Sequence, residues 1–335
     1  MITTGHLGAA IRQHWHAFTD GERPPERLSF LLLTKGAQSL GKMVLLTFVG
    51  AEARPRFVVK LGRLKEHNDA IQTEYRNLQR IEAYGRHGRV RTPRPLLCWE
   101  DAGRLCLLES ALDGPDLWRA TARARSVAFL DPIVDWLIHL ARSTQGPRPR
   151  HPAVTRTELI DRVAGHVRSG REHAQLEILS RQLARHPADP LPQVFQHDDM
   201  GTWNVTVARD GTIGILDWEA SRHDGVPAVD LFYFLAFYGS MMDTVLAPAD
   251  RLRSFVETFF GHGPFARLAR SAVHRYAQAL ALSRGWLAPL FGICWLQQTI
   301  VDVERDGFAL SDSLSWQMLA TMLERDGRFN FLEAA

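Results

Sequence analysis

The chain has little cysteine, with only Cys98, Cys106 and Cys294 among its 335 residues. Thiols so few and so widely spaced do not build a disulfide framework or a cysteine-ligated zinc site. The default compartment for such a sequence is the reducing cytoplasm, and we expect the protein there. The N-terminal residues show no basic stretch leading into an apolar core, so we expect no signal peptide.

Long apolar runs are lacking as well. The longest uncharged apolar stretch near the C-terminus, residues 287–299, is too short to cross a bilayer. The sequence has no zinc-finger spacing, no RNA-binding aromatic motif and no long run of Lys or Arg. We therefore expect neither a membrane nor a nucleic acid as a partner, and the oligomeric state stays open.

The composition is otherwise that of a globular protein, with 45% hydrophobic and 23% charged residues. The length suits one large domain or two lobes. The net charge of +3 is unevenly spread, because residues 1–192 carry 29 basic and 20 acidic side chains whereas residues 193–335 carry 11 and 17. This asymmetry would suit an anionic ligand meeting a cationic or polyhydroxyl one. Ordinary solvated surface explains it equally well.

The first third of the chain has the pattern of a β-sheet. Apolar runs rich in β-branched and aromatic residues alternate with turn residues, which predicts strands at 28–34, 43–50, 56–62, 95–100 and 104–110. Apolar residues at helical spacing predict a helix over 67–83, after the third strand. A short amphipathic helix is expected over 6–18. The prediction is a five-stranded antiparallel sheet with one inserted helix.

The pattern changes after a hinge near residues 110–115. Helices are expected over 126–142 and 156–185, short strands and turns over 193–217, and helices again over 228–327. We therefore predict an α+β protein with two lobes. Residues 1–110 would form a small lobe of antiparallel sheet, and residues 111–335 a larger, mainly helical lobe.

The strongest chemical signal lies between residues 194 and 219. A short apolar strand runs into His197, Asp198 and Asp199, and Asn204 follows five residues after Asp199. A predicted hairpin then ends at Asp217, and its geometry should bring Asn204 and Asp217 side by side. Carboxylate and amide oxygens facing one point suit Mg²⁺ with phosphate ligands. Asp199 could accept a proton from an alcohol.

This run, H-x-D-x-x-x-x-N followed by I-L-D-W-E, resembles the aminoglycoside phosphotransferase and choline kinase-like family, which has the protein-kinase-like fold. The resemblance implies that Asp199 is the catalytic base and that Asn204 and Asp217 hold the metal. It also implies that His197 braces the loop. Asp230, in a later G-V-P-A-V-D-L segment, would bond the loop's backbone.

The resemblance extends into the first lobe. Lys60, in F-V-V-K, matches the lysine that contacts ATP phosphates, and Glu74 matches the helix glutamate that pairs with it. Residues 35–42 stand where the phosphate-covering loop belongs, with Gly36, Ser39 and Gly41 as its candidate contacts. Residues 109–112 look like the hinge that receives adenine through backbone bonds, with Glu109 and Ala111 as the candidate residues.

Two features depart from related patterns. Asp198 stands where the family usually has glycine. In an extended segment its side chain would point away from that of Asp199. Its charge could still raise the pKa of Asp199. Protein kinases place arginine at this position, and they also have an Ala-Pro-Glu segment that this sequence lacks. The missing arginine argues against control by a phosphorylated activation loop, and the missing Ala-Pro-Glu segment argues against a protein substrate.

Any one of these residues alone is more often a surface or turn residue than a catalytic one. Their joint order and spacing, with Lys60, Glu74, Asp199, Asn204 and Asp217 on the expected elements, favours an enzyme. We expect an ATP-dependent phosphotransferase that uses Mg²⁺ and acts on a hydroxyl of a small molecule, such as an aminoglycoside, another antibiotic, a sugar or an amino alcohol. GTP in place of ATP stays open. The alternatives are a nucleotide-binding pseudokinase acting as an interaction module and, less favoured, a protein kinase.

Overall fold

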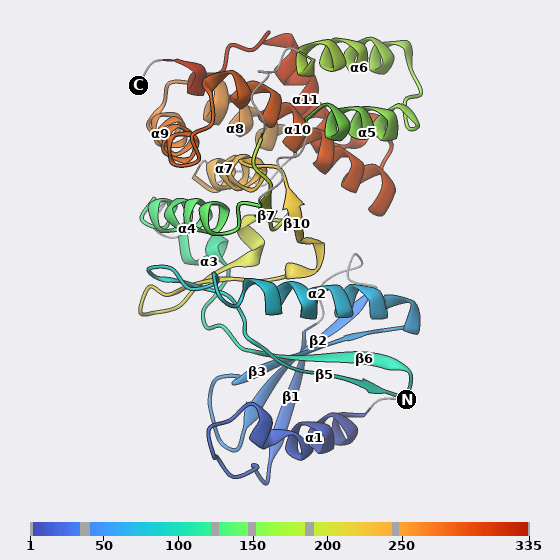
Figure 1. Ribbon diagram of the computed structural model, residues 1–335, viewed down its shortest axis with the longest axis vertical. Helices are drawn as coiled ribbons and strands as arrows, with labels where there is room; N and C mark the ends of the chain where they lie inside the picture. The colour runs from blue at the N-terminus through green and yellow to red at the C-terminus, as the bar shows by residue number, and fades with distance from the viewer. Residues whose placement is uncertain are drawn as a thin grey trace. The chain divides into compact units, whose positions relative to one another are not determined.

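The computed structural model describes residues 3–33, 41–121, 127–146, 152–184, 191–242 and 248–333 (Figure 1). The chain divides into two compact units. Unit 1 comprises Met1–Pro115 and Asn204–Ser221, and unit 2 comprises Asp116–Trp203 and Arg222–Ala335. The sequence placed the boundary at residue 110 and assigned the later hairpin to the second lobe; in the structure this hairpin belongs to unit 1.

A five-stranded antiparallel sheet forms the centre of unit 1. Its spatial order is β1-β2-β3-β6-β5. The strands are β1 (Leu28–Leu33), β2 (Lys42–Val49), β3 (Phe57–Gly62), β5 (Pro95–Asp101) and β6 (Arg104–Ser110). Helix α2 (Asn68–Ile81) follows β3. The predicted sheet and its inserted helix are confirmed.

The two faces of this sheet have different neighbours. Helix α1 (Thr4–Gln13) and a short 3₁₀ turn pack on one face, where Trp15 joins a buried apolar cluster with Val59 and Leu61 of β3. Figure 1 shows α1 and α2 on opposite faces of the sheet. Because side chains alternate along a strand, Lys60 points to the face that α2 covers.

A second, three-stranded sheet completes unit 1. Strand β4 (Val90–Arg91) pairs in parallel with β9 (Ile213–Ile215), which pairs antiparallel with β8 (Val205–Val207). The hairpin was predicted from sequence, but β4 was not, because two residues are too few to show a period. This pairing attaches the hairpin to unit 1.

Unit 2 is mainly helical. Its short strands β7 (Val194–Gln196) and β10 (Arg222–Gly225) pair antiparallel. The described helices are α3 (Leu117–Thr121), α4 (Leu130–Ser143), α5 (Pro152–Ala164), α6 (Gly170–Leu183), α7 (Val229–Met242), α8 (Pro248–Phe260), α9 (Pro264–Ala279), α10 (Leu287–Ile300) and α11 (Leu314–Glu324). Helices α7 and α10 are apolar on all sides and almost wholly buried, as expected for the centre of a helical core. In the ranges that the structure describes, no helix is long and apolar enough to cross a membrane.

One helix prediction was wrong in extent. The sequence suggested a single helix over 156–185, but the structure has α5 and α6 with a break between them. Ser169 caps α6 by accepting a hydrogen bond from the Glu172 N–H, and the Glu172 carboxylate accepts one from the Ser169 N–H in return. This capping box is a start signal that apolar periodicity alone overlooks.

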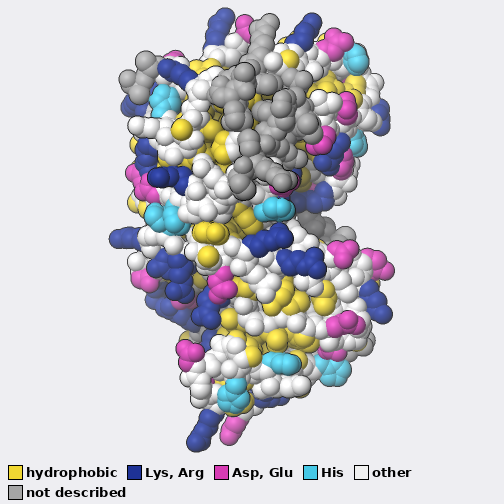
Figure 2. All heavy atoms as spheres, viewed as in Figure 1, with side chains coloured by type: hydrophobic (Ala, Val, Ile, Leu, Met, Phe, Trp, Pro, Cys, Tyr) yellow, Lys and Arg dark blue, Asp and Glu magenta, His cyan; other side chains and the backbone are white. Residues whose placement is uncertain are grey.

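The surface carries both signs of charge. Figure 2 shows one face of the molecule, on which Lys and Arg side chains are interspersed with Asp and Glu, and apolar patches show between them. On this face the charge asymmetry of the sequence does not produce a surface of one sign, which agrees with the solvated-surface interpretation.

Candidate active site

A buried ion pair joins the sheet of unit 1 to helix α2. Lys60 on β3 is 5% exposed and donates a hydrogen bond to the carboxylate of Glu74, which is fully buried. Glu74 shares the buried face of α2 with Ile71 and Leu78, three residues before and four residues after it. The ion pair expected from the sequence is therefore present.

Glu109 adds a second carboxylate that the sequence analysis considered only for its backbone. Its side chain is 2% exposed and lies 3.1 Å from the Lys60 Nζ. Burial raises the pKa of Glu109 to about 7, although the charge of Lys60 opposes this shift. The strand register could have indicated Glu109, because β6 places it opposite Val58, which shares a strand face with Lys60.

Lys60 stays charged despite its burial. Desolvation alone would lower the pKa of Lys60, but the nearby carboxylates of Glu109, Glu74 and Asp217 together raise it well above its ordinary value. The Lys60 Nζ lies 3.7 Å from Asp217. A permanent cation in a nearly water-free setting can bind anionic phosphate oxygens strongly.

The hairpin in unit 1 brings the ends of its strands together, as predicted. Val205 pairs with Ile215, and the Leu216 N–H donates to the Asn204 carbonyl at 2.8 Å. Asn204 is 2% exposed. Asp217 has a left-handed backbone, with φ of 69°, which is unfavourable for a residue other than glycine and tends to persist at functional sites.

Asn77 of α2 holds the segment after Asp217 in place. Its side-chain amide donates to the carbonyls of Trp218 and Ser221, each at 2.9 Å. The Trp218 indole donates to the Ile215 carbonyl at 3.0 Å. These buried hydrogen bonds fix the backbone on which Asp217 sits, although Asn77 was not singled out from the sequence.

Lys42 and Glu219 complete the cluster. The Lys42 Nζ forms an ion pair with Asp217, lies 2.9 Å from Glu219 and 3.6 Å from Glu74. Burial would lower the pKa of Lys42, but the charges of Glu74 and Asp217 outweigh it and raise the pKa. The register could have indicated Lys42, because Val44, two residues along β2, pairs with Lys60.

The cluster suits a hard cation such as Mg²⁺. Carboxylate oxygens of Glu74, Asp217 and Glu219 all lie within 4.8 Å of one another. One oxygen of Glu74, Oε2, is buried and has no hydrogen-bond partner among the described residues. Oxygen donors of this kind are the ligands that Mg²⁺ prefers. These donors fit Mg²⁺, and they share Asp217 with the pair of metal residues, Asn204 and Asp217, that the family resemblance implies.

The loop after β7 in unit 2 is anchored by Asp230. Its two carboxylate oxygens accept backbone N–H groups from His197 at 2.7 Å and Asp198 at 3.0 Å. This is the contact that the resemblance implied. Burial raises the pKa of Asp230 to about 7 against the effect of both donors.

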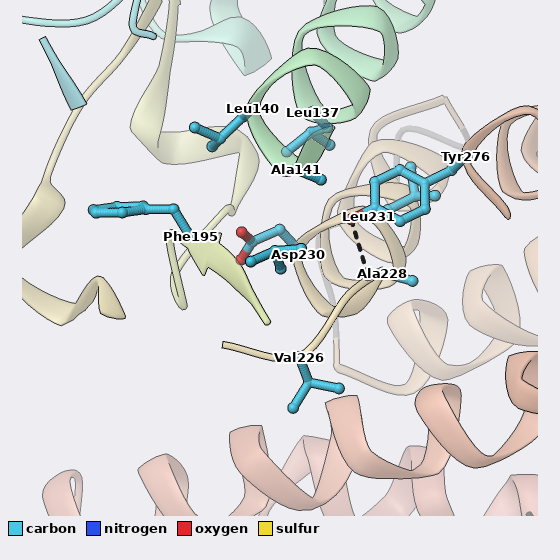
Figure 3. A pocket seen from close by; sticks show the side chains of 10 residues that line it. Leu137, Leu140, Ala141, Phe195, Val226, Ala228, Asp230, Leu231 and Tyr276 are labelled. Carbon is cyan, nitrogen blue, oxygen red and sulfur yellow. Dashed lines mark hydrogen bonds between the residues drawn. The ribbon is translucent and has the colours of Figure 1, made fainter. Parts of the chain in front are cut away.

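A small cavity of about 10 Å³ lies beside this carboxylate, near the lower limit for holding one water molecule. In Figure 3 the Tyr276 hydroxyl meets the backbone of Ala228, whose N–H donates to it at 3.2 Å. The surrounding side chains of Leu137, Leu140 and Leu231 are apolar. So little space makes this cavity a packing feature of unit 2.

His197 braces the loop rather than standing free in it. Its side chain is fully buried, and its Nδ1 accepts the backbone N–H of Asp199 at 3.3 Å. The side chain of Asp199 is only partly buried. The backbone beside Asp199 is therefore held by the buried ring of His197.

Asp198 differs from the expectation. Its backbone is left-handed, with φ of 69°, so the segment is not extended there. Its carboxylate pairs with Arg222 and accepts a hydrogen bond from Gln196, and its carbonyl accepts the Gln298 side-chain amide at 3.1 Å. Burial raises the pKa of Asp198, while Arg222 opposes the shift. Asp198 is therefore engaged in holding the loop.

Aromatic rings lie close to this loop in unit 2. Trp203 is 42% exposed and packs edge-on against Phe237 and Tyr233, with ring centroids 4.8 and 6.0 Å apart. Burial and the nearby charge of Asp199 raise the pKa of Tyr233. An exposed ring near Asp199 offers an apolar contact for a substrate.

The remaining predicted contacts have mixed outcomes. Gly36 and Ser39 lie outside the described residues, whereas the Gly41 carbonyl accepts the Arg63 N–H at 3.1 Å. The Ala111 N–H donates to the Arg56 carbonyl at 3.0 Å. That N–H is already engaged, so an adenine hinge would have to use other backbone groups of residues 109–112.

Comparisons with known proteins agree with this architecture. A thermostable mutant of an aminoglycoside phosphotransferase, solved in its apo form, superposes with a TM-score of 0.56 at 12% identity, covering 95% of this chain and 98% of that one. Choline kinase from Streptococcus pneumoniae gives a TM-score of 0.53 at 12% identity, covering 88% and 94%. No curated protein sequence matches the chain. The α+β, protein-kinase-like fold expected from the sequence is confirmed.

The sequence comparison reaches the same result independently. The model of the phosphotransferase enzyme family matches residues 46–266, about two thirds of the chain. This range includes the Lys60–Glu74 pair, the loop at His197–Asp199 and the hairpin that carries Asn204 and Asp217. The chain therefore belongs to the phosphotransferase enzyme family.

Proposed function

We infer that this protein transfers the γ-phosphate of ATP to a hydroxyl group of a small molecule. The observation that carries this inference is the buried cluster of unit 1, where Lys60, paired with Glu74, lies 3.7 Å from Asp217. Binding of a nucleoside triphosphate requires a fixed cation beside a carboxylate-based metal site. GTP would meet the same groups through its phosphates, so the preference for ATP or GTP is left to experiment.

Lys60 would bind phosphate oxygens, with Glu74 and Glu109 holding its ammonium in place. Asn204 and Asp217 would hold Mg²⁺, which supplies charge neutralisation at the phosphates when bound. The left-handed backbone of Asp217 and the Asn77 hydrogen bonds fix this part of the site before substrate arrives. Such preorganisation lowers the cost of orienting the reacting groups.

Asp199 would act as the base. Its carboxylate takes the proton of the acceptor hydroxyl, the hydroxyl oxygen forms the new bond to the γ-phosphorus, and the bond from that phosphorus to ADP breaks. Asp230 and His197 support this role, because both bond the backbone of residues 197–199. Since Asp198 is paired with Arg222, Asp199 is the better candidate of the two.

The acceptor is a hydroxylated small molecule, and the aromatic group of Trp203, Tyr233 and Phe237 would give it an apolar contact. Aminoglycosides, other antibiotics, sugars and amino alcohols all remain candidates. The test is a screen of such compounds with ATP and Mg²⁺, read by mass spectrometry as the gain of one phosphate. Transfer by the wild type and its loss in Asp199→Asn would support the proposal. Transfer that persists unchanged in Asp199→Asn would contradict the assigned base.

A further inference from the structure

The ammonium of Lys42 lies at the position where a metal ion would be expected. Glu74, Asp217 and Glu219 bring carboxylate oxygens within 4.8 Å of one another, and the Lys42 Nζ contacts all three residues. The distances are 2.9 Å to Glu219 and 3.6 Å to Glu74, and Asp217 forms the closest pair. The ammonium of Lys42 therefore lies among the three carboxylates.

Glu74 provides an independent sign that this position can take another cation. It is fully buried, and one of its oxygens pairs with Lys60. The other oxygen, Oε2, has no hydrogen-bond partner in the described part of the chain, and Lys42 at 3.6 Å is too far to donate to it. Oε2 thus faces the Lys42 ammonium without a hydrogen bond, and a buried acceptor without a hydrogen bond is unfavourable.

The charges explain why Lys42 and a free metal ion would compete. Within this cluster two ammonium groups, on Lys42 and Lys60, face four carboxylates, namely the three above and Glu109, which lies 3.1 Å from Lys60. The Lys42 side chain is only 16% exposed, so water screens its charge weakly. A divalent ion arriving alone would sit a few ångströms from this ammonium. A nucleotide triphosphate arriving with the ion would give Lys42 a new anionic partner.

We propose that Lys42 excludes free divalent metal from the site and yields its place only when metal arrives with the nucleotide. The Lys42 ammonium would then leave Asp217 for the polyphosphate, and the Asp217 carboxylate would be available to hold the ion. This inference rests on the proposed function, since it shares Asp217 with the metal site proposed there. It adds Lys42, which the sequence analysis did not name among the candidate contacts of residues 35–42.

The experiment measures Mn²⁺ binding to the nucleotide-free protein, with Mn²⁺ chosen because it takes oxygen ligands and its free concentration can be read by electron paramagnetic resonance. Wild type should bind Mn²⁺ weakly. Lys42→Met should bind it at least about tenfold more tightly, because a like charge a few ångströms away has gone. Lys42→Gln should do the same, which guards against one variant that fails to fold. Adding Asp217→Asn to Lys42→Met should abolish the gain.

Two controls define the result. Lys42→Arg keeps the charge and should bind Mn²⁺ as weakly as wild type, and Lys65→Met removes an exposed lysine and should change nothing. Micromolar binding of Mn²⁺ by nucleotide-free wild type, or unchanged binding by folded Lys42→Met, would overturn the proposal. A parallel titration of wild type with Mn²⁺ and ATP separates this inference from the proposed function. If wild type does not bind Mn²⁺ together with ATP, the proposed function is contradicted. If it does, but Lys42→Met binds Mn²⁺ alone no more tightly than wild type, only the role of Lys42 is contradicted.

Discussion

We predict that substitution of Lys60 lowers the free energy of unfolding more than substitution of its partner Glu74. Lys60 is the cation nearest to Glu74 and Glu109, and it lies 3.7 Å from Asp217. Lys60→Met would leave Glu74 and Asp217 with Lys42 as a neighbouring cation and would remove the ammonium that pairs with Glu109. Breaking a buried ion pair by removing one partner costs about 3–5 kcal/mol, and we expect Lys60→Met to lie in that range.

Glu74→Gln should be milder. Its amide oxygen can still accept a hydrogen bond from Lys60, and Lys60 keeps Glu109 at 3.1 Å and Asp217 at 3.7 Å. The loss is then close to that of one charge-assisted hydrogen bond, about 1.5–3 kcal/mol. Removing the lysine should therefore cost more than removing the charge of its partner.

Equilibrium urea unfolding, followed by circular dichroism and tryptophan fluorescence, measures the difference. Because the chain has two units, each transition must be fitted separately when the two probes do not coincide. Lys65→Met, an exposed lysine on the same unit, serves as the control and should change the free energy of unfolding by less than about 0.5 kcal/mol. If Lys60→Met proved no more destabilising than Glu74→Gln, Lys60 would not be the main compensating charge of this cluster.

Three further predictions follow from the loop and the titrating groups. Asp199→Asn should lower turnover roughly 10²–10⁴-fold in a phosphate-transfer assay while nucleotide affinity stays unchanged; equal loss of both would refute its role as base. Asp230→Ala should destabilise unit 2 by about 2–5 kcal/mol in urea unfolding, since two buried N–H groups lose their acceptor; a neutral effect would show that this anchor is dispensable. The pKa of Glu109 is raised to about 7 from 4.5, so the folded state holds more protons than the unfolded state between these values. The free energy of unfolding should then fall as pH rises through that window, and Glu109→Gln should flatten the fall in a pH series; an unchanged slope would contradict it.

Much of unit 1 was predictable because its signals are local. The five strands show as apolar runs bounded by turn residues and helix α2 by its apolar spacing, and their observed bounds differ from the predicted ones by at most two residues. The Lys60–Glu74 pair follows from a strand end and the helix after it. The hairpin follows from its turn residues, and its two ends meet where the Leu216 N–H, one residue before Asp217, bonds the Asn204 carbonyl.

The parts that were not predicted depend on contacts between distant segments. Lys42 ends the segment 35–42 and Glu219 ends the I-L-D-W-E run, but neither was given a role, and both become significant only when β2 and the end of the hairpin meet in unit 1. Strand β10 has no apolar period and forms by pairing with β7. The left-handed backbone of Asp198 is imposed by its surroundings, because Asp230, Arg222 and Gln298 all bond that residue. Local propensity contains none of this information.

Calorimetric titration with ATP and Mg²⁺ tests the central claim most directly. The account predicts a single site whose affinity requires Mg²⁺, is lost in Asp217→Ala and is retained in Asp199→Asn. GTP should be titrated as well, because the cluster would contact only the phosphates and does not select between adenine and guanine. If neither nucleotide bound at millimolar concentration with Mg²⁺ present, or if Asp217→Ala bound as well as wild type, the cluster around Lys60 and Asp217 would not be a nucleotide site.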